Sequence, residues 1–377
     1  MNPSIERAKH PGKYIQEKLD ERGWTQEELA TILGRHAGTI GNLIRGKTGI
    51  TPSMAVSLST VLGGTAKDWL DLNTQYSLSL VETDVDEVSR RARLFELAPI
   101  RDMQRRGWIK ATSDCEELEK ELKQFYGVES IEKGVSLPVA AKRSTKLKEL
   151  TSSEIAWYFR ARQLAASMSV AEFDQRLLPK LWKKLRLLAA YPKEAGRLGS
   201  LLSEYGIRFV VIEPLPGMKI DGAAFWLSGS EPAIAVSIQH DRIDSFWFTV
   251  MHECAHIRAG DALSVDTELT DETKGISVSL AEEEAERLAN DAAAHSLISK
   301  DELFSFISRV GPYYSKERVI QFAHAIKIHP GIIVGQLQYR KELGYSALRE
   351  LLPKVRESVI TTALTDGWNQ MIAPVAI

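Results

Sequence analysis

The chain has 377 residues, of which 44% are hydrophobic and 26% are charged, and its formal net charge is −2. This composition is ordinary for a soluble globular protein of two or three domains, and it excludes a globally basic nucleic-acid binder, though not a local basic patch. Two cysteines, Cys115 and Cys254, are too few for a disulfide framework, and the sequence has neither a signal segment nor an apolar run of about 18 residues, so we expect a cytoplasmic protein without membrane contact.

Residues 9–73 predict a series of short helices. Thr25 and Glu28 form a capping box that begins a helix over 26–33, and a second helix follows over 37–45. Two short helices joined by a tight turn are typical of a helix-turn-helix.

This region resembles the Xre-type helix-turn-helix, and more closely its HigA-like antitoxin branch. The resemblance covers about the first 75 residues and rests on four blocks in order, His10–Gly12, Trp24–Ala30, Gly46–Pro52 and Ala66–Leu72. It implies a DNA-binding domain over residues 1–75 that represses transcription at a double-stranded operator, with a cognate toxin as a further partner.

In that family the second helix enters the major groove, and its first turn reads base edges. Nine Lys and Arg face eight Asp and Glu within residues 1–75, so attraction to the phosphates is weak and we expect a homodimer. The alternative is a helix-turn-helix that serves protein contacts or dimerisation. Expected base contacts are His36, Thr39 and Asn42, and expected phosphate contacts are Gln26, Arg45 and Lys47.

Residues 76–190 are interpreted as a helical connector. An amphipathic helical stretch over 84–126 is broken at Pro99, and a linker is expected over 134–146. The helical segment that follows, through Ala190, has aromatic residues at helical spacing, which indicates core packing.

From Gly206 the pattern changes to strands over 207–212, 223–227 and 233–237. They precede His252-Glu253-Cys254-Ala255-His256, an HExxH motif. On a helix, residues four apart share a face, so both imidazoles can bind one metal ion. In zinc hydrolases of this pattern the glutamate, here Glu253, is the general base and not a ligand. The alternative is a pair of surface histidines on a polar helix.

A third ligand is expected from a helix over 280–292. Its small apolar residues form one face, which consists of Ala281, Ala285, Leu288, Ala289 and Ala292. Helical spacing places Glu282 close to that face, Glu284 near its other edge, and Glu283 away from it. Glu282 is therefore the predicted third ligand and Glu284 the second choice. Glu286, one turn after Glu282, is expected to accept a hydrogen bond from a ligating imidazole.

Residues from about 195 to 345 strongly resemble the ImmA/IrrE family of metallopeptidases. The resemblance supports Glu282 with Glu286 behind it, and it implies Zn²⁺ as cofactor and a peptidase domain over 191–345. Leu288-Ala289 stands where this family usually has an aromatic residue and an alanine. The resemblance rests on the HExxH motif and on the blocks Leu215–Gly217, Asp221–Trp226, Asp241–Phe248, Glu282–Ala285 and His329–Gln338.

The expected fold is mainly α with a small β-sheet (α+β). After the peptidase domain, residues 346–377 are expected to form a C-terminal extension. The expected protein is a DNA-binding repressor or antitoxin whose zinc peptidase domain cleaves a regulatory protein or itself in response to a signal. The alternative is a repressor or antitoxin whose metal domain senses a ligand or binds a protein partner without proteolysis. Candidates for stabilising an oxyanion are His240, His295, His324 and Tyr205.

Overall fold

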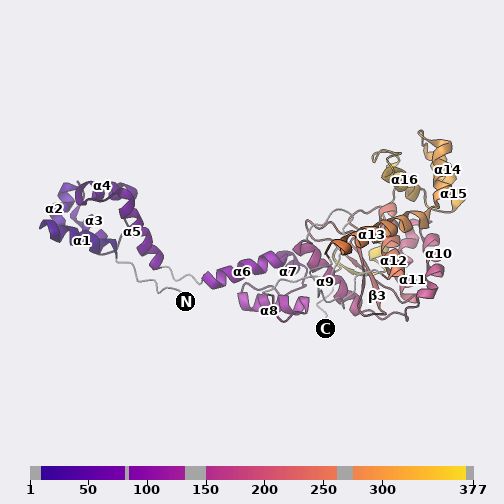
Figure 1. Cartoon of the computed structure of the whole chain (residues 1–377), viewed down its shortest axis with the longest axis horizontal. Helices are drawn as coiled ribbons and strands as arrows, with labels where there is room; N and C mark the ends of the chain where they lie inside the picture. The colour runs from indigo at the N-terminus through magenta and orange to yellow at the C-terminus, as the bar shows by residue number, and fades with distance from the viewer. Residues whose placement is uncertain (1–9, 81–84, 132–149, 261–274, 371–377) are drawn as a thin grey trace. The chain divides into compact units, whose positions relative to one another are not determined.

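A computed structural model describes residues 10–80, 85–131, 150–260 and 275–370, and of 85–86 and 275–283 it describes the backbone alone (Figure 1). The chain divides into two compact units, Met1–Val88 and Ser89–Ile377, each of which is described by itself. No helix within the described ranges is long and apolar enough to cross a membrane.

Residues 10–80 of the first unit form five helices around one small core. Two of the helices begin at capping boxes, Thr25 with Glu28 and Thr65 with Asp68, because each pair satisfies backbone N–H groups at the helix start. The second and third helices match the expected helix-turn-helix to within one residue. The helices are α1 (Pro11–Arg22), α2 (Gln26–Ile32), α3 (Ala37–Ile44), α4 (Pro52–Leu62) and α5 (Ala66–Ser79). The core consists mainly of Ile15, Leu19, Leu29, Ile40, Leu58 and Trp69.

The second unit contains a mixed sheet in the order β2-β3-β1-β4. Strand β1 pairs in parallel with β3 and β4, whereas β2 runs antiparallel to β3 and forms one edge. The three expected strands are present, each with bounds within one residue of the prediction. The fourth strand was not predicted, and it comes from the segment interpreted as a C-terminal extension. The strands are β1 (Arg208–Ile212), β2 (Gly222–Trp226), β3 (Pro232–Val236) and β4 (Leu364–Asp366).

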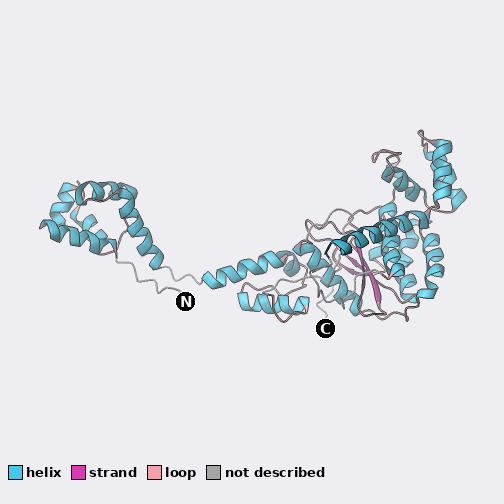
Figure 2. Cartoon of the chain, in the orientation of Figure 1, coloured by secondary structure: helices cyan, strands magenta, loops and turns pink. Residues whose placement is uncertain are grey.

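Helices cover both faces of this sheet (Figure 2). Side chains alternate across each strand, so that Phe209 and Val211 pack on one face while Val210 and Ile212 pack on the other. On the first face, α11 (Leu198–Glu204) and α12 (Ile243–Ala259) contact the strands directly. The same hydrophobic cluster extends to α10 (Leu178–Leu188), α13 (Gly275–Leu297), α14 (Lys300–Val310), α15 (Lys316–Ile326), α16 (Pro330–Tyr339) and α17 (Arg356–Ile360). On the second face, α9 (Ser152–Ala166) contacts β1 directly. The hydrophobic cluster of this face also includes residues of α6 (Val85–Leu97), α7 (Ile100–Arg105) and α8 (Cys115–Tyr126).

A buried ion pair joins the last strand to the helices of the second face. Arg160 Nε of α9 donates to Asp366 Oδ2 of β4 at 2.5 Å, and Trp108 Nε1 donates to the same oxygen at 3.1 Å. Both charged side chains are completely buried. The expected connector and the expected C-terminal extension are thus packed together on the same sheet. The linker expected over 134–146 lies outside the described residues.

Candidate metal centre

Helix α12 carries the HExxH motif between edge strand β2 and helix α13. Its residues Phe246, Trp247, Val250 and Met251 are buried in the core, and Gly260 ends the helix in a left-handed conformation (φ 72°). Ser245, Phe248, Thr249, His252 and His256 recur at helical spacing on the other side.

Two imidazoles of α12 and one carboxylate of α13 meet at a single point. The Nε2 atoms of His252 and His256 lie 3.1 Å apart. Glu286 places Oε2 at 3.4 Å from His252 Nε2 and Oε1 at 3.4 Å from His256 Nε2. Helices α12 and α13 lie side by side (Figure 1), so residues 30 or more positions apart supply the two halves of the cluster.

The spacing of these atoms fits a tetrahedral zinc ion. Zinc bonds to nitrogen and oxygen of about 2.0–2.2 Å place the ligand atoms of a tetrahedron about 3.3–3.6 Å apart. The two Nε2 atoms lie 3.1 Å apart, and each lies 3.4 Å from a different oxygen of Glu286. One ligand atom from each residue lies within 4.8 Å of the other two, a separation that one metal ion can bridge. Glu286 Oε1 is also buried without a hydrogen-bond partner in the described part of the chain, as expected of an oxygen that faces a cation.

The electrostatics of Glu286 favour the ionised form. Burial alone would raise the pKa of this carboxyl, but His252 and His256 beside it outweigh burial and hold the pKa at about 2. At neutral pH Glu286 is therefore a carboxylate, the form that binds a metal ion.

Glu253 lies next to the cluster and is only 6% exposed. Burial raises the pKa of its carboxyl, while the neighbouring His252 and His256 oppose that shift. The carboxyl also bonds to the backbone of Ala224 in edge strand β2. A buried carboxyl with a raised pKa is suited to accept and return a proton.

Glu286 is the third residue of the cluster. The sequence analysis expected it only to accept a hydrogen bond from a ligating imidazole, with Glu282 as the third ligand. The side chain of Glu282 lies outside the described residues. Glu284, the second choice, is exposed and pairs with Arg287 at 2.6 Å, outside the cluster. The expected apolar face included Leu288, which is 53% exposed; the buried positions Ala289, Ala293 and Leu297 define a rotated face on which Glu286 lies.

In the first unit, the expected DNA contacts divide into two groups. His36 and Thr39 at the start of α3 are exposed, as are Arg45 and Lys47 just after it. Asn42 is half-buried, and its Oδ1 accepts a hydrogen bond from Arg45 at 3.1 Å. Gln26 is also half-buried, and its Nε2 donates to Gln16 at 3.1 Å.

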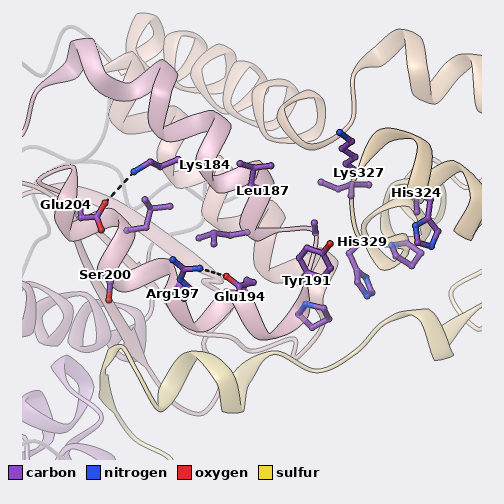
Figure 3. Close-up of a pocket in the computed structure, with 17 residues that line it drawn as sticks. Lys184, Leu187, Tyr191, Glu194, Arg197, Ser200, Glu204, His324, Lys327 and His329 are labelled. Carbon is purple, nitrogen blue, oxygen red and sulfur yellow. Dashed lines mark hydrogen bonds and ion pairs between the residues drawn. The ribbon is translucent and has the colours of Figure 1, made fainter.

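A separate cavity of about 1050 Å³ lies among α10, α11, α15 and the start of α16, and none of the three cluster residues lines it (Figure 3). Its charged side chains are largely paired, Lys184 with Glu204 at 3.5 Å and Arg197 with Glu194 at 2.8 Å. His324, one of the candidates for stabilising an oxyanion, lines this cavity.

Comparison with known proteins finds relatives of the first unit. The HTH_3 helix-turn-helix family model matches residues 15–70. The chain is 42% identical over 84 residues to the HTH-type transcriptional regulator YddM of Escherichia coli K12, covering 22% of this chain and 88% of that protein. It is 37% identical over 67 residues to antitoxin HigA-1 of Vibrio cholerae, covering 18% of this chain and 61% of that one. An addiction module antidote protein of a HigA family from Coxiella burnetii matches with 27% identity over 20% of this chain and 82% of that chain, with a TM-score of 0.19.

These matches define a class of DNA-binding protein, the helix-turn-helix regulators, and α2 and α3 provide its two characteristic helices. The chain belongs to the family of HTH-type transcriptional regulators. The expected resemblance of residues 1–75 to HigA-like antitoxins is confirmed.

Proposed function

We propose that this chain is a HigA-type regulator with a zinc-dependent peptidase centre, which cleaves a regulatory protein or the chain itself in response to a signal. The observation that carries the proposal is the convergence of His252, His256 and Glu286, with ligand atoms within 4.8 Å of one another, beside the buried Glu253. We propose Glu286 as the third ligand; Glu282, the ligand expected from the sequence, has a side chain outside the described residues.

Bound Zn²⁺ would supply a Lewis acid that polarises a peptide carbonyl and lowers the pKa of water. The chain's own residues perform the remaining tasks. His252 and His256 would hold the ion through Nε2, and the charge of Glu286 would offset part of its positive charge. Glu253 takes a proton from the attacking water and returns it to the leaving amine.

Strand β2 supports a peptide as the substrate. It is an edge strand, so one side of its backbone has no partner strand in the described sheet. An extended peptide can add to such an edge through main-chain hydrogen bonds. Because Ala224 of β2 bonds to Glu253, a peptide on this edge would lie beside the general base.

The helix-turn-helix supports a regulatory setting for this chemistry. HigA-1 is named an antitoxin, and by analogy we propose that this chain binds a double-stranded operator as a homodimer and has a cognate toxin as partner or substrate. His36, Thr39, Arg45 and Lys47 are the exposed residues available for DNA.

The test is to purify the full chain without chelators, measure its zinc content, and incubate it with zinc while following its mass and that of a co-expressed toxin. The proposal expects about one zinc per chain and a defined cleavage product that is missing from Glu253→Gln. Zinc binding without any cleavage would favour the alternative in which the metal domain senses a ligand.

A further inference from the structure

We propose that the cavity at the N-terminal end of α12 is the pocket that selects one substrate side chain, and that it prefers tyrosine. The inference rests on the proposed peptidase function. The cavity has a volume of about 380 Å³, which is enough for a large side chain. Helices α12 and α16 and the segment around Tyr345 form its walls.

The cavity lies one helical turn from the metal centre. Phe248 lines it, and the rings of Phe248 and His252 have centroids 6.2 Å apart. Four helical residues span about 6 Å along the axis, and an extended peptide advances about 3.3–3.6 Å per residue. A side chain within about two residues of the scissile bond would therefore reach this cavity.

The walls are apolar and aromatic. Phe248, Leu297 and Ile332 supply apolar surface, and the rings of Tyr339 and Tyr345 line the cavity while exposed to solvent. Aromatic surroundings of this kind favour a flat ring, because ring pairs in offset or edge-to-face geometry gain energy beyond the area that they bury.

One buried polar group in this lining is unsatisfied. The side chain of Gln336 is 6% exposed, and its Oε1 is buried without a hydrogen-bond partner among the described residues. Such an acceptor is costly to leave unpaired. A phenol O–H of a bound tyrosine would donate to it, whereas phenylalanine would leave it unpaired.

The charged groups in the lining are already paired with each other. Arg242 donates to both carboxylate oxygens of Asp244, at 3.0 and 2.7 Å, and also to Gln338 Oε1 at 2.8 Å. Gln338 in turn donates to the Ala347 carbonyl at 3.2 Å. A charged substrate side chain would lose its hydration here without gaining an unpaired counter-charge, so a neutral side chain is preferred.

The experiment measures peptide binding without turnover, in the full-length Glu253→Gln chain reconstituted with zinc. Fluorescein-labelled peptides of sequence Gly-Ala-Ala-X-Ala-Ala-Gly, with X as Tyr, Phe, Glu or Lys, are titrated by fluorescence anisotropy. Tyrosine should bind about fivefold to tenfold tighter than phenylalanine, the value of one net hydrogen bond. The Glu and Lys peptides should bind more weakly than phenylalanine.

Two added substitutions test the pocket itself. Gln336→Met should reduce the tyrosine-to-phenylalanine ratio to about one, because it keeps side-chain length and removes the acceptor. Tyr345→Ser, at an exposed position, should weaken both peptides and keep their ratio. Leu187→Ala, in the cavity of Figure 3, is the matched control and should change neither, with thermal melting confirming the fold of each variant.

Equal binding of the Tyr and Phe peptides, a ratio that survives Gln336→Met, or no peptide binding at all would overturn the inference. Cleavage by the wild-type chain is scored separately. Cleavage without any tyrosine preference would leave the peptidase proposal standing and remove this one. A tyrosine preference that depends on Gln336, without any cleavage, would support the proposal for the cavity and contradict the proposed peptidase activity.

Discussion

Gly222 of β2 and Glu253 of α12 are in direct contact. A Cβ atom added to Gly222 would lie 3.0 Å from Glu253 Oε1 and 2.6 Å from Thr249 Cγ2. The edge strand therefore packs closely against Thr249 and the proposed general base because residue 222 has no side chain.

Gly222→Ala should displace the carboxylate of Glu253 and lower the rate of hydrolysis by about tenfold or more, since small misplacements of a catalytic group are costly. Zinc content should not change, because the three ligands are elsewhere. Gly229→Ala is the matched control, since a Cβ at Gly229 meets nothing within 4 Å. Steady-state cleavage assays with zinc analysis check this, and equal rates for the two variants would contradict the contact's role.

Glu286→Gln should weaken zinc binding by at least about 100-fold, because even partners of metal ligands cost 10–100-fold when removed. Glu284→Gln, in the same helix but paired with Arg287, should have little effect. Competition with a chromophoric chelator measures both affinities. A parallel pair of variants, Glu282→Gln and Glu283→Gln, tests the third ligand expected from the sequence. A larger loss of zinc affinity in Glu282→Gln than in Glu286→Gln would identify Glu282 as that ligand.

Glu253→Gln should keep both zinc and DNA binding and abolish hydrolysis, because an amide cannot accept the proton of the attacking water. In cells, the regulated genes should then stay repressed under the inducing condition. A promoter fusion reports this outcome. Normal derepression in the variant would show that peptidase activity is not the switch.

DNA binding should depend on α3 and on the residues after it in different ways. Thr39→Ala should weaken binding to an operator selected from random DNA and relax its sequence preference. Lys47→Ala should weaken binding to all DNA sequences alike. It should also reduce the slope of log affinity against log salt concentration by about one. Footprinting and salt titrations separate the two effects. An unchanged footprint in the double variant Thr39→Ala, Asn42→Ala would exclude this role for α3.

The first unit should lose stability in acid. Hydrogen bonds from the backbone N–H and the hydroxyl of Thr25 lower the pKa of Glu28, and Thr65 does the same for Asp68. A lowered folded pKa gives stability that is complete above the ordinary values of 4.5 and 3.8 and is lost as pH falls through the folded values. Hydrogen exchange of residues 10–80 should show this loss, and Thr25→Ala should reduce its size.

Local signals in the sequence predicted the parts of the fold that neighbouring residues determine. The capping box at Thr25 defined a helix start, and the four-residue spacing of His252 and His256 placed both rings on one face. The position of Glu286 depends on the rotation of α13 about its axis relative to α12. The sequence pattern gave the wrong rotation, because it counted Leu288 as part of the buried face although that side chain is exposed. Strand β4 pairs with β1 across about 150 residues of chain, and no local pattern specifies such a partner.

The placement of β4 also fixes when each part of the protein can mature during synthesis. Strand β1 is flanked on one side by β3 and on the other by β4, whose last residue is Asp366. The sheet, and with it the buried bond between Asp366 and Arg160, is incomplete until residue 366 has left the ribosome. The helix-turn-helix has its own core in residues 15–69 and can fold much earlier. A nascent or prematurely terminated chain would therefore carry a folded helix-turn-helix before, or without, a complete sheet beside the proposed metal centre.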